Sequence, residues 1–356
     1  MPKAEELAEI VVNGKRYRDW KTVAASRSGQ AWFSTCAFSV ASPAETRQGW
    51  AAQKLRVGDK CQVYLAGVKA IDGEIGTRQP AFNEAQRGLQ IIVKSKNVGV
   101  ELTTADHKPG EFKGYSLRQI GERLLKPTGS KLIVRGSPDG IDKVFPRFNV
   151  AVGETVANAL TRMMRTRNLF VTDDADGNIV LFRNSGGEGA TGELREGANI
   201  RAASLIIDNE NVLQGIEVEG SLPSNDQRFG NSANRQTGKA ENTGVQNGRT
   251  LTIFAEMPGD AQDMKMRAEH ELAENQVTMV QGQITVQGWL NGGRLWMADI
   301  GKNVNVVSDF LFPTGSMMLT INDVTHRQGP EGTMTDIGLV IPSRYGGSGR
   351  IDAIAG

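Results

Sequence analysis

The amino-acid sequence predicts a β-rich α+β fold with several domains, in which two related antiparallel β-barrels flank a small α+β insert domain. Three observations lead to this prediction. Apolar and polar residues alternate in both halves of the chain, as in half-buried strands. The period changes to that of an amphipathic helix near residue 115. Glycine accounts for 42 of the 356 residues, well above its usual share of about 7%, which is typical of a fold with many tight turns.

The first barrel is expected at residues 10–110. The runs Trp32–Val40 and Lys60–Leu65 each place apolar side chains on one face of a strand, and Leu89–Val93 is a short apolar run. Strands of this length separated by turn residues are typical of a small antiparallel barrel or sandwich.

Two dipeptides in this region are expected to form hairpin turns. They are Asn13-Gly14 and Asp72-Gly73. Both central positions of a type I′ turn need a positive φ, which asparagine, aspartate and glycine tolerate best.

The insert domain is expected at residues 111–185. Ser116 is a good N-cap and Gln119 follows three positions later, which is the pattern of a capping box. A second helix is expected from about Gly153 to Arg167. Two short strands should follow it, joined by a turn at Asp176-Gly177-Asn178.

The second barrel is expected at residues 186–344. Within it, residues 223–248 are polar and almost free of large apolar side chains, so they are expected to form a long loop. An amphipathic helix is expected at residues 260–275. Residues 345–356 are expected to be a flexible C-terminal tail.

A short internal repeat suggests that the two barrels are related. Val57–Val63 and Ile300–Val306 share the pattern apolar, glycine, two polar, apolar, polar, apolar. Each run is followed by a strand that reaches a possible turn, at Ile71-Asp72-Gly73 and at Ile321-Asn322-Asp323. Duplication is the favoured interpretation, although short β segments also resemble one another by chance.

Charge and cysteine content exclude some partners and environments. With 41 basic and 40 acidic side chains, the chain has no broad electrostatic footprint for nucleic acid or an anionic membrane. No stretch reaches the roughly 18 apolar residues of a membrane span, and the first residues lack the apolar core of a signal peptide. We therefore expect folding in a cytoplasm, where two buried free thiols at Cys36 and Cys61 are favoured over a disulfide.

Histidine chemistry is not expected. His107, His270 and His326 are far apart in sequence, and none belongs to a recognisable metal-binding spacing. No catalytic serine, catalytic cysteine or phosphate-binding loop motif occurs either. We therefore predict no enzymatic activity and no catalytic, cofactor-binding or metal site.

Two groups of carboxylates are candidates for a glycosidase pair. Glu217 and Glu219 share one face of a strand, and Asp173, Asp174 and Asp176 cluster at a turn. We interpret the first group as a solvated strand face and the second as an aspartate-rich hairpin loop.

Two further groups could mark a binding surface. Arg162, Arg165 and Arg167 form a basic patch on the second helix, which more often solubilises a helix than binds phosphate. Trp289 and Trp296 flank a glycine hairpin. Tryptophan is enriched at protein interfaces, but cross-strand pairing inside a barrel explains these positions equally well.

The order of the segments resembles a known family. The segments that carry the resemblance are Val12–Trp20, Phe112–Leu117, Val152–Val156, Leu194–Ile200, Val286–Trp289 and Leu295-Trp296. In this order, from about residue 10 to 344, they resemble the baseplate hub proteins of Mu-like contractile-tailed bacteriophages. That family is related to phage late-control tail proteins and to the hub part of type VI secretion spikes.

The resemblance implies a structural late protein of the virion, located in the tail baseplate and assembled in the host cytoplasm. It implies a homotrimer that acts as a symmetry adaptor between the six-fold tail tube and the three-fold spike. The implied partners are further copies of the chain, the tube or initiator protein, the central spike and the wedge proteins. It implies no cofactor, no membrane segment and no specific nucleic-acid binding, although the lumen would face DNA or tape-measure protein.

Two alternatives remain at this point. One is the hub of a tailocin or of another contractile injection system. The other belongs to a different class, a tail-associated cell-wall hydrolase or glycan-binding module.

Overall fold

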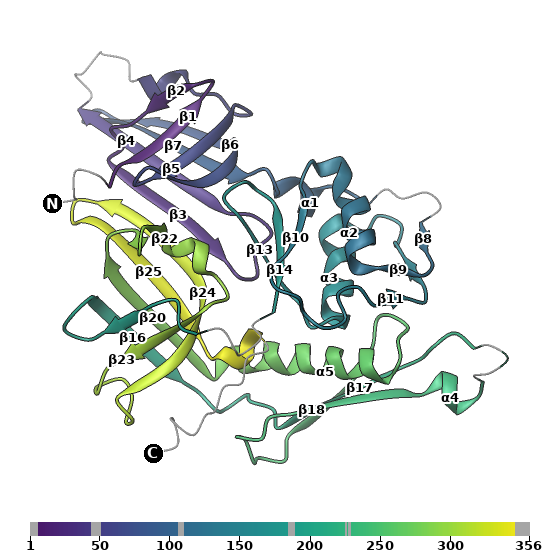
Figure 1. The fold of residues 1–356 in the computed structure, drawn as a ribbon. Coiled ribbons are helices and arrows are strands. Elements are labelled where there is room, and N and C mark those ends of the chain that lie inside the picture. Colours follow the sequence, from purple (N-terminus) through teal and green to yellow (C-terminus); the bar gives the residue numbers. More distant parts are fainter. Residues whose placement is uncertain are drawn as a thin grey trace.

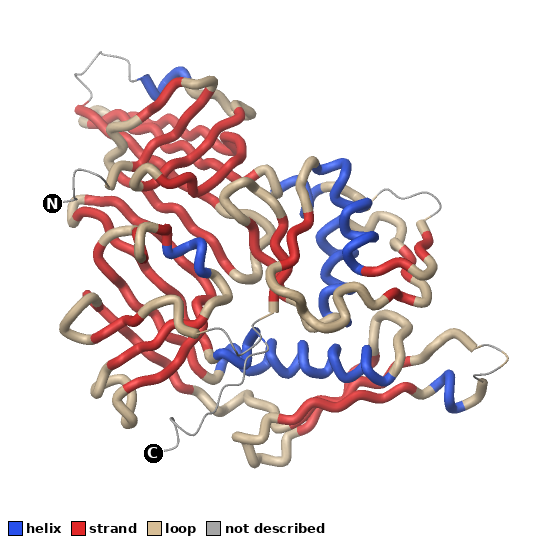
Figure 2. Tube along the Cα trace, viewed as in Figure 1, coloured by secondary structure: helices blue, strands red, loops and turns tan. Residues whose placement is uncertain are grey.

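The computed structural model describes residues 6–43, 51–105, 110–183, 189–224, 226 and 229–345. A long twisted sheet occupies the left of the view in Figure 1, and the longer helices lie together on the right and along the bottom. Figure 2 shows the same separation of strands from helices. The fold is therefore β-rich, as predicted.

The main sheet has 13 strands, drawn from both halves of the chain. The strands of the N-terminal half are β1 (Ala8–Val12), β2 (Lys15–Tyr17), β3 (Thr22–Ser28), β4 (Thr35–Pro43), β5 (Lys60–Leu65), β6 (Val68–Phe82) and β7 (Gln86–Ser95). Those of the C-terminal half are β15 (Glu193–Arg195), β16 (Ile200–Ile207), β20 (Val280–Gln287), β23 (Asn303–Val307), β24 (Ser316–Gly329) and β25 (Gly332–Val340). Short 3₁₀ turns accompany them at η1 (Ala51–Lys54), η4 (Trp296–Asp299) and η5 (Pro342–Tyr345).

The two halves of this sheet repeat one topology. The N-terminal half has the strand order β3-β4-β7-β6-β5-β1, and the C-terminal half has the order β16-β20-β25-β24-β23-β15. Corresponding strands also follow one another in the same order along the chain. The corresponding pairs are antiparallel, except that β15 pairs with β23 in parallel.

Two separate closed barrels are not confirmed, because the described strands form one continuous sheet. The halves join where β24 pairs with β3, from Asp323↔Ser28 to Gln328↔Val23. β24 has 14 residues, so it is long enough to pair with β23 through its first part and with β3 through its second. Length and register, which set this pairing, are not visible in short sequence patterns.

The first part of the internal repeat is aligned as expected, because Gly58 and Gly301 donate to the equivalent residues Ile75 and Ile321, but the second part is shifted. The structural counterpart of Ile321 is Ile75 and not Ile71, since Ile75 and Ile321 each precede a register shift at the same place in the repeated topology. Ile321-Asn322-Asp323 is therefore a β-bulge inside β24, where a turn was expected.

One expected hairpin turn is also wrong. Asp72-Gly73 lies inside β6, because Gly73 allows β7 to approach: a Cβ at this position would lie 1.9 Å from the carbonyl oxygen of Lys94. The turn before β6 is at Ala66-Gly67, where φ is 50° and 77°. The sequence pattern cannot separate a glycine needed for a turn from one needed for close strand packing.

Other turns form where they were expected. Asn13 and Gly14, with φ of 49° and 75°, join β1 to β2. Gly177, with φ of 66°, lies in the turn between two strands of the insert. Gly292 and Gly293 (φ 57° and 84°) join β21 (Leu290–Asn291) to β22 (Arg294–Leu295).

The insert has its own core of buried side chains, separate from that of the main sheet. Ser116 and Gln119 form the expected capping box at the start of its first long helix. Its second long helix begins at Val156 after an N-cap at Thr155, three residues later than expected. Trp32, expected in the first barrel, packs in this core.

The elements of the insert are short. They are α1 (Val98–Leu102), β8 (Glu111–Phe112), β9 (Tyr115–Ser116), α2 (Leu117–Leu125), η2 (Lys126–Thr128), β10 (Leu132–Val134), β11 (Val144–Phe145), β12 (Phe148–Asn149), α3 (Val156–Thr166), β13 (Phe170–Asp173) and β14 (Ile179–Phe182).

A third unit lies along the bottom of Figure 1. It consists of β17 (Gly215–Gly220), α4 (Asn231–Asn234), β18 (Gln236–Glu241), β19 (Thr250–Phe254), α5 (Ala261–Asn275) and η3 (Gln276–Thr278). The helix expected at residues 260–275 is α5, with Asp260 as its N-cap. Its inner face covers the three-stranded sheet β18-β17-β19.

The prediction of a long loop at residues 223–248 is wrong in part, because this stretch contains α4 and β18. β18 pairs with β17 along its whole length. Small residues, not large apolar ones, let it pack under α5: a Cβ at Gly238 would lie 2.1 Å from the backbone nitrogen of Lys265. Composition therefore underestimated the order of this segment.

The expected tail at residues 345–356 is contradicted at its first residue. Tyr345 ends η5 and is fully buried, and its hydroxyl donates to Asn322 Oδ1 at 2.6 Å. Residues 346–356 lie outside the described part of the chain.

Candidate assembly surfaces

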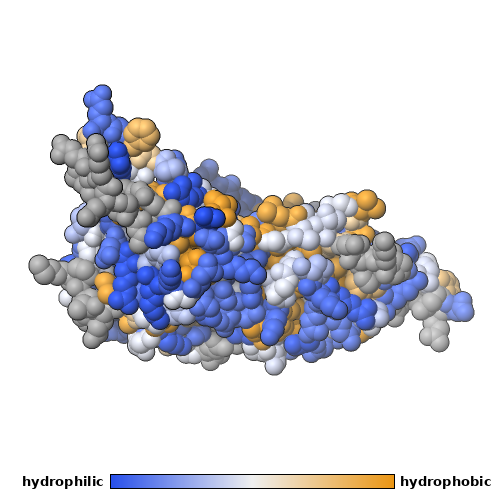
Figure 3. All heavy atoms as spheres, turned by 90° about the horizontal axis from the view of Figure 1, so that it is seen from above, coloured by the Kyte–Doolittle hydropathy of each residue, from blue (hydrophilic) through white to orange (hydrophobic). Residues whose placement is uncertain are grey.

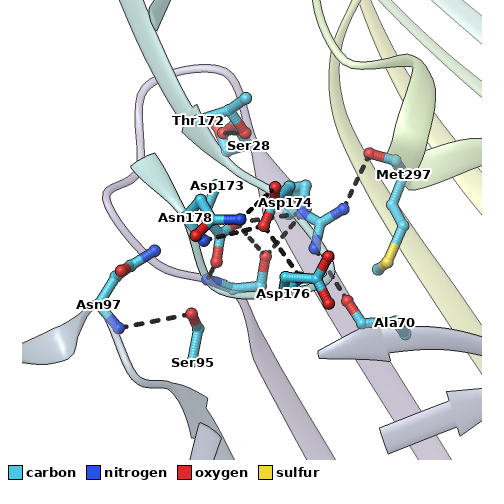
Figure 4. Close-up of polar contacts among 12 residues, drawn as sticks. Ser28, Ala70, Ser95, Asn97, Thr172, Asp173, Asp174, Asp176, Asn178 and Met297 are labelled. Carbon is cyan, nitrogen blue, oxygen red and sulfur yellow. Dashed lines mark hydrogen bonds and ion pairs between the residues drawn. The ribbon is translucent and has the colours of Figure 1, made fainter. Parts of the chain in front are cut away.

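The candidate aspartate cluster is a structural joint between the insert and the main sheet (Figure 4). Asp173 is buried where the insert meets the main sheet. Its carboxylate accepts hydrogen bonds from Arg27 Nε at 3.1 Å and from the Ser34 backbone N–H at 2.9 Å. Arg27 also donates to the carbonyl of Ala70 at 2.9 Å. The carboxylate is thus committed to holding β13 against the sheet.

The neighbouring aspartates shape the turn. Asp174 Oδ1 accepts the backbone N–H of Asp176 at 2.9 Å and that of Asn178 at 2.8 Å. Asp176 forms an ion pair with Lys69 of β6, and the hydrogen bond from Lys69 lowers the pKa of Asp176. The interpretation as an aspartate-rich hairpin loop is confirmed, with the added finding that this loop is tied to β6.

The glutamates on β17 are paired with cations. Glu217 lies 3.1 Å from Lys239 Nζ, and Glu219 lies 3.1 Å from an Arg235 guanidinium nitrogen. Both contacts cross from β17 to the neighbouring β18 or the residue before it. Each glutamate is therefore paired with a cation on or next to β18, as in the interpretation of a solvated strand face.

Two histidines are buried and neutral. His326 Nδ1 lies 2.8 Å from Thr335 Oγ1, and burial, with a smaller contribution from Arg27, lowers the pKa of His326 to about 3. His270 stacks on Phe170, with 4.8 Å between ring centroids, and burial lowers its pKa well below the usual value. Both rings are therefore packed inside the fold. His107 lies outside the described residues.

The three arginines of α3 and its C-cap do not form one patch. Arg162 pairs with Glu154 at 2.7 Å, and Arg165 contacts Glu256 at 3.4 Å. Arg167 is fully buried and pairs with Asp263 of α5 at 2.6 Å. The interpretation as a solubilising patch is therefore wrong for Arg167, whose burial lowers its pKa.

The tryptophans that flank the glycine hairpin belong to the core. Trp289 is fully buried and its Nε1 donates to the carbonyl of Arg327 at 3.0 Å, while Trp296 is 5% exposed. Both side chains therefore pack in the core of the main sheet.

Neither a candidate metal cluster nor a membrane-spanning helix occurs among the residues that the structure describes. Within the described ranges, no group of three or more histidine, cysteine, aspartate or glutamate side chains is arranged to hold a metal ion. Among the helices of these same ranges, none is long and apolar enough to cross a bilayer. Cys36 and Cys61 are both buried and free, as expected.

An open cleft lies between the insert, α5 and β18. Its volume is about 850 Å³. Arg135, Lys239 and Lys265 line it together with Glu241 and Glu269, so charges of both signs alternate on its walls. This mixture selects neither an anion nor a cation.

Exposed apolar side chains at strand edges are the strongest functional signal. On β16, Ile206 is 60% and Ile207 47% exposed, and at the far end of β6, Phe82 is 86% exposed. On β19, Phe254 is 76% exposed. Edge strands with exposed apolar side chains are ready to pair with another chain unless something covers them. Figure 3 shows apolar patches set in the mostly hydrophilic face seen from above.

Sequence reasoning missed these edges. Alternation identifies β6 and β16 as strands, but it does not tell which neighbours a strand will have. An eight-residue strand of the form IRAASLII, with apolar residues on both faces, was the signal that could have pointed to a covered edge.

Two family models match the chain. Residues 8–93 match the N-terminal domain described as Mu phage baseplate assembly protein GpP-like. Residues 103–183 match the second domain described as baseplate hub protein gp44-like. Among curated proteins, the baseplate hub protein gp44 of Escherichia phage Mu is 24% identical over 293 residues, which is 81% of this chain and 76% of that protein.

Solved structures share the fold over nearly the whole chain. A 43 kDa tail protein of prophage MuSo2 from Shewanella oneidensis has a TM-score of 0.79 at 22% identity, covering 96% of this chain and 99% of its own. A tail protein from Neisseria meningitidis MC58 has a TM-score of 0.77 at 16% identity, covering 95% of this chain and 97% of its own.

Proposed function

The chain is a baseplate hub protein of the Mu-like phages, a structural component of the tail, and from this premise we propose that it works as a trimeric symmetry adaptor. Three copies would form a ring between the six-fold tail tube and the three-fold spike. The tube or initiator protein and the spike would bind opposite faces of the ring, and wedge proteins its outside. Assembly would take place in the host cytoplasm before the tail is complete.

One observation carries the proposal: the two halves of the main sheet repeat the same strand order. Three chains with two such halves supply six similar β units around one axis. A ring of six similar units can face a six-fold tube, while the exact symmetry of the ring stays three-fold. A chain without this repeat would have no means of presenting six similar surfaces from three copies.

The remaining parts would carry the three-fold character. The insert and the unit of α5 with β17, β18 and β19 each occur once in the described part of the chain. We therefore place them away from the tube-facing surface, toward the spike or the wedge proteins. The division into residues 10–110, 111–185 and 186–344 stays part of this proposal.

A structural role also fits the polar groups of the chain. The candidate carboxylates are paired or shape a turn, and the two described histidines are buried. Nothing observed favours the alternative of a cell-wall hydrolase or glycan-binding module.

Native mass spectrometry of the purified protein tests the proposal, together with averaging of ring images. The expected result is a trimer whose image has three-fold symmetry with six similar lobes. A protein that stays monomeric at high micromolar concentration, both alone and with its spike, overturns the ring. Turnover of purified peptidoglycan at enzymatic rates would favour the hydrolase.

A further inference from the structure

Within one chain, the halves of the main sheet are joined by β24 and β3. The pairing is antiparallel, and it opposes Val324 to Arg27, Thr325 to Ser26 and His326 to Ala25. Facing side chains touch across it, since Ser26 Oγ lies 3.0 Å from Thr325 Oγ1. The second part of β24, in the C-terminal half, thus pairs with β3, the first long strand of the N-terminal half.

β6 is the counterpart of β24 in the repeated order, and the two strands share an irregularity. Each has a register shift against the next strand, after Ile75 in β6 and after Ile321 in β24. The carbonyl of Ile75 accepts the N–H of Gly58, and that of Ile321 accepts the N–H of Gly301, both at 2.8 Å. The residues of β6 that follow the register shift therefore correspond one to one to the residues of β24 that pair with β3.

β16 is the counterpart of β3, and its alignment follows from the neighbouring strands. Val23 of β3 opposes Phe38 of β4, and Ala203 of β16 opposes Ile284 of β20. Phe38 opposes an isoleucine of β7, and Ile284 opposes an isoleucine of β25. These two isoleucines lie at the same distance from the register shifts against β6 and β24, so Phe38 and Ile284 correspond. Val23 and Ala203 are therefore equivalent positions.

β24 and β3 cover each other's edges, whereas the corresponding edges of β6 and β16 have no paired strand among the residues described. Beyond Glu74, β6 pairs with β7 alone among the strands described, and β16 likewise pairs only with β20. His326 of β24 is fully buried, whereas Phe82, Ile206 and Ile207 on the uncovered strands are 86%, 60% and 47% exposed. Each uncovered edge is the structural equivalent of one that is covered within the chain.

We propose that the second part of β6 pairs antiparallel with β16 of the next copy of the chain, repeating between chains the β24–β3 junction that exists within each chain. The inference deepens the proposed function and rests on it, because it requires a ring of identical chains. Transferring the register of the internal junction gives five opposed pairs: Arg78 with Ile207, Gln79 with Ile206, Pro80 with Leu205, Ala81 with Ser204 and Phe82 with Ala203 of the neighbour.

The geometry of this contact suits a closed ring. It is heterologous, since it joins two different edges of the chain. β6 lies in the upper part of the molecule in Figure 1 and β16 in the lower part, so one chain cannot satisfy both edges itself. Three chains would contain three β24–β3 junctions and three β6–β16 junctions, which makes six similar contacts around the axis.

The composition of the edges fits a specific partner. The pairing would cover Phe82, Ile206 and Ile207, whose exposure in a single chain favours association. Pro80 has no N–H, so it removes at most one hydrogen bond from the new ladder. Before assembly, a proline on an open edge also discourages pairing with unrelated strands.

Disulfide crosslinking tests the proposed register. In Gln79→Cys combined with Ile206→Cys, the two thiols of neighbouring chains should lie as close as Ser26 and Thr325 do within one chain. Directly opposed Cβ atoms are about 4.5 to 5.5 Å apart, which a disulfide can span. Mild oxidation should convert most of the protein to covalent trimer on a non-reducing gel. Each single variant should form no covalent trimer on the same gel.

Two further double variants serve as controls. Ser26→Cys with Thr325→Cys should form an intramolecular disulfide, which shows that the internal junction has the stated geometry. Gln79→Cys with Ala202→Cys is out of register, and it should give at least about tenfold less trimer than the matched pair.

The outcomes separate this inference from the proposed function. If native mass shows a trimer but the matched pair crosslinks no better than the out-of-register pair, the β6–β16 junction is wrong and the ring remains. If native mass shows no trimer for the unmodified chain, both alone and with its spike, the proposed function fails together with the inference. Circular dichroism of the reduced variants verifies that each one is folded.

Discussion

Several buried charges lie where separate parts of the molecule meet, and they are paired there with groups of opposite sign. Arg27 and Asp173 join the sheet to the insert at 3.1 Å. Arg344 of η5 lies 2.8 Å from Glu274 of α5, with its guanidinium 4.7 Å from the Phe170 ring centroid. Buried pairs add little net stability compared with apolar residues, but removal of one partner leaves an uncompensated charge. These residues therefore fix how the parts are placed.

The junction between α3 and α5 provides a residue-scale prediction. Asp263 is 1% exposed and accepts from Arg167 at 2.6 Å and from Lys143 at 2.7 Å. Asp263→Ala should lower the free energy of unfolding by about 3 to 5 kcal/mol, because Arg167 stays buried without its carboxylate. Chemical denaturation measures this. Asp142→Ala, which removes an exposed pair with Arg118, should cost less than about 1 kcal/mol.

Buried neutral histidines predict a loss of stability in acid. His326 has a folded-state pKa of about 3, so below about pH 6.5 the unfolded chain binds a proton that the folded chain does not. Stability should therefore be complete above pH 6.5 and fall by about 1 kcal/mol per pH unit from pH 6.5 toward pH 3. His270, whose pKa is also lowered, should add to the slope.

Denaturation curves at several pH values between 4 and 8 measure that slope. His326→Gln should be less stable than the unmodified chain at pH 7, since it disturbs the contact with Thr335, yet it should lose less stability on acidification. An unchanged slope in this variant would assign the acid sensitivity to other groups.

At the scale of elements, local sequence patterns predicted the helices and several turns, whereas the pairing between strands could not be predicted from them. The capping box at Ser116 and the Asn13-Gly14 turn depend on residues a few positions apart, and both form as expected. Gly73 was misread, because the carbonyl that it must accommodate belongs to Lys94 on another strand. Strand β18 was missed, since its order comes from α5 and β17 and not from its own apolar residues.

Gly238 provides an element-scale prediction about the contact between β18 and α5. A Cβ here would lie 2.1 Å from Lys265 N and 2.3 Å from the Met264 carbonyl carbon, both backbone atoms that cannot move aside alone. Gly238→Ala should therefore displace α5 and destabilise the chain by about 1 to 3 kcal/mol. Gly329→Ala, where nothing lies within 4 Å of the added Cβ, should change stability by less than about 0.5 kcal/mol. Thermal denaturation of both variants compares them directly.

At the scale of the whole molecule, the sequence predicted a repeat but not the way its copies join. The pattern shared by Val57–Val63 and Ile300–Val306 places β5 and β23 at equivalent positions, as the strand orders show. Whether each copy closes on itself or pairs with the next depends on the lengths of β6 and β24 beyond their bulges. In this chain, β6 extends past its short neighbour β5, and β24 extends past its short neighbour β23. β3 pairs with the extension of β24, and the extension of β6 keeps an open edge.

A ring that is closed by strand pairing should show its assembly in thermal stability. Association stabilises the folded state by mass action, so the Tm of the unmodified chain should rise by a few degrees over a roughly hundredfold increase in concentration. Ile206→Lys places a charge on the open edge of β16 at a side chain that is 60% exposed, so the single chain should still fold. Its Tm should be independent of concentration and its native mass that of a monomer. Val144→Lys, at a 49% exposed apolar residue of the insert, should keep the trimer and the concentration dependence of the Tm. Loss of the trimer in Val144→Lys with its retention in Ile206→Lys would move the interface from the sheet edge to the insert.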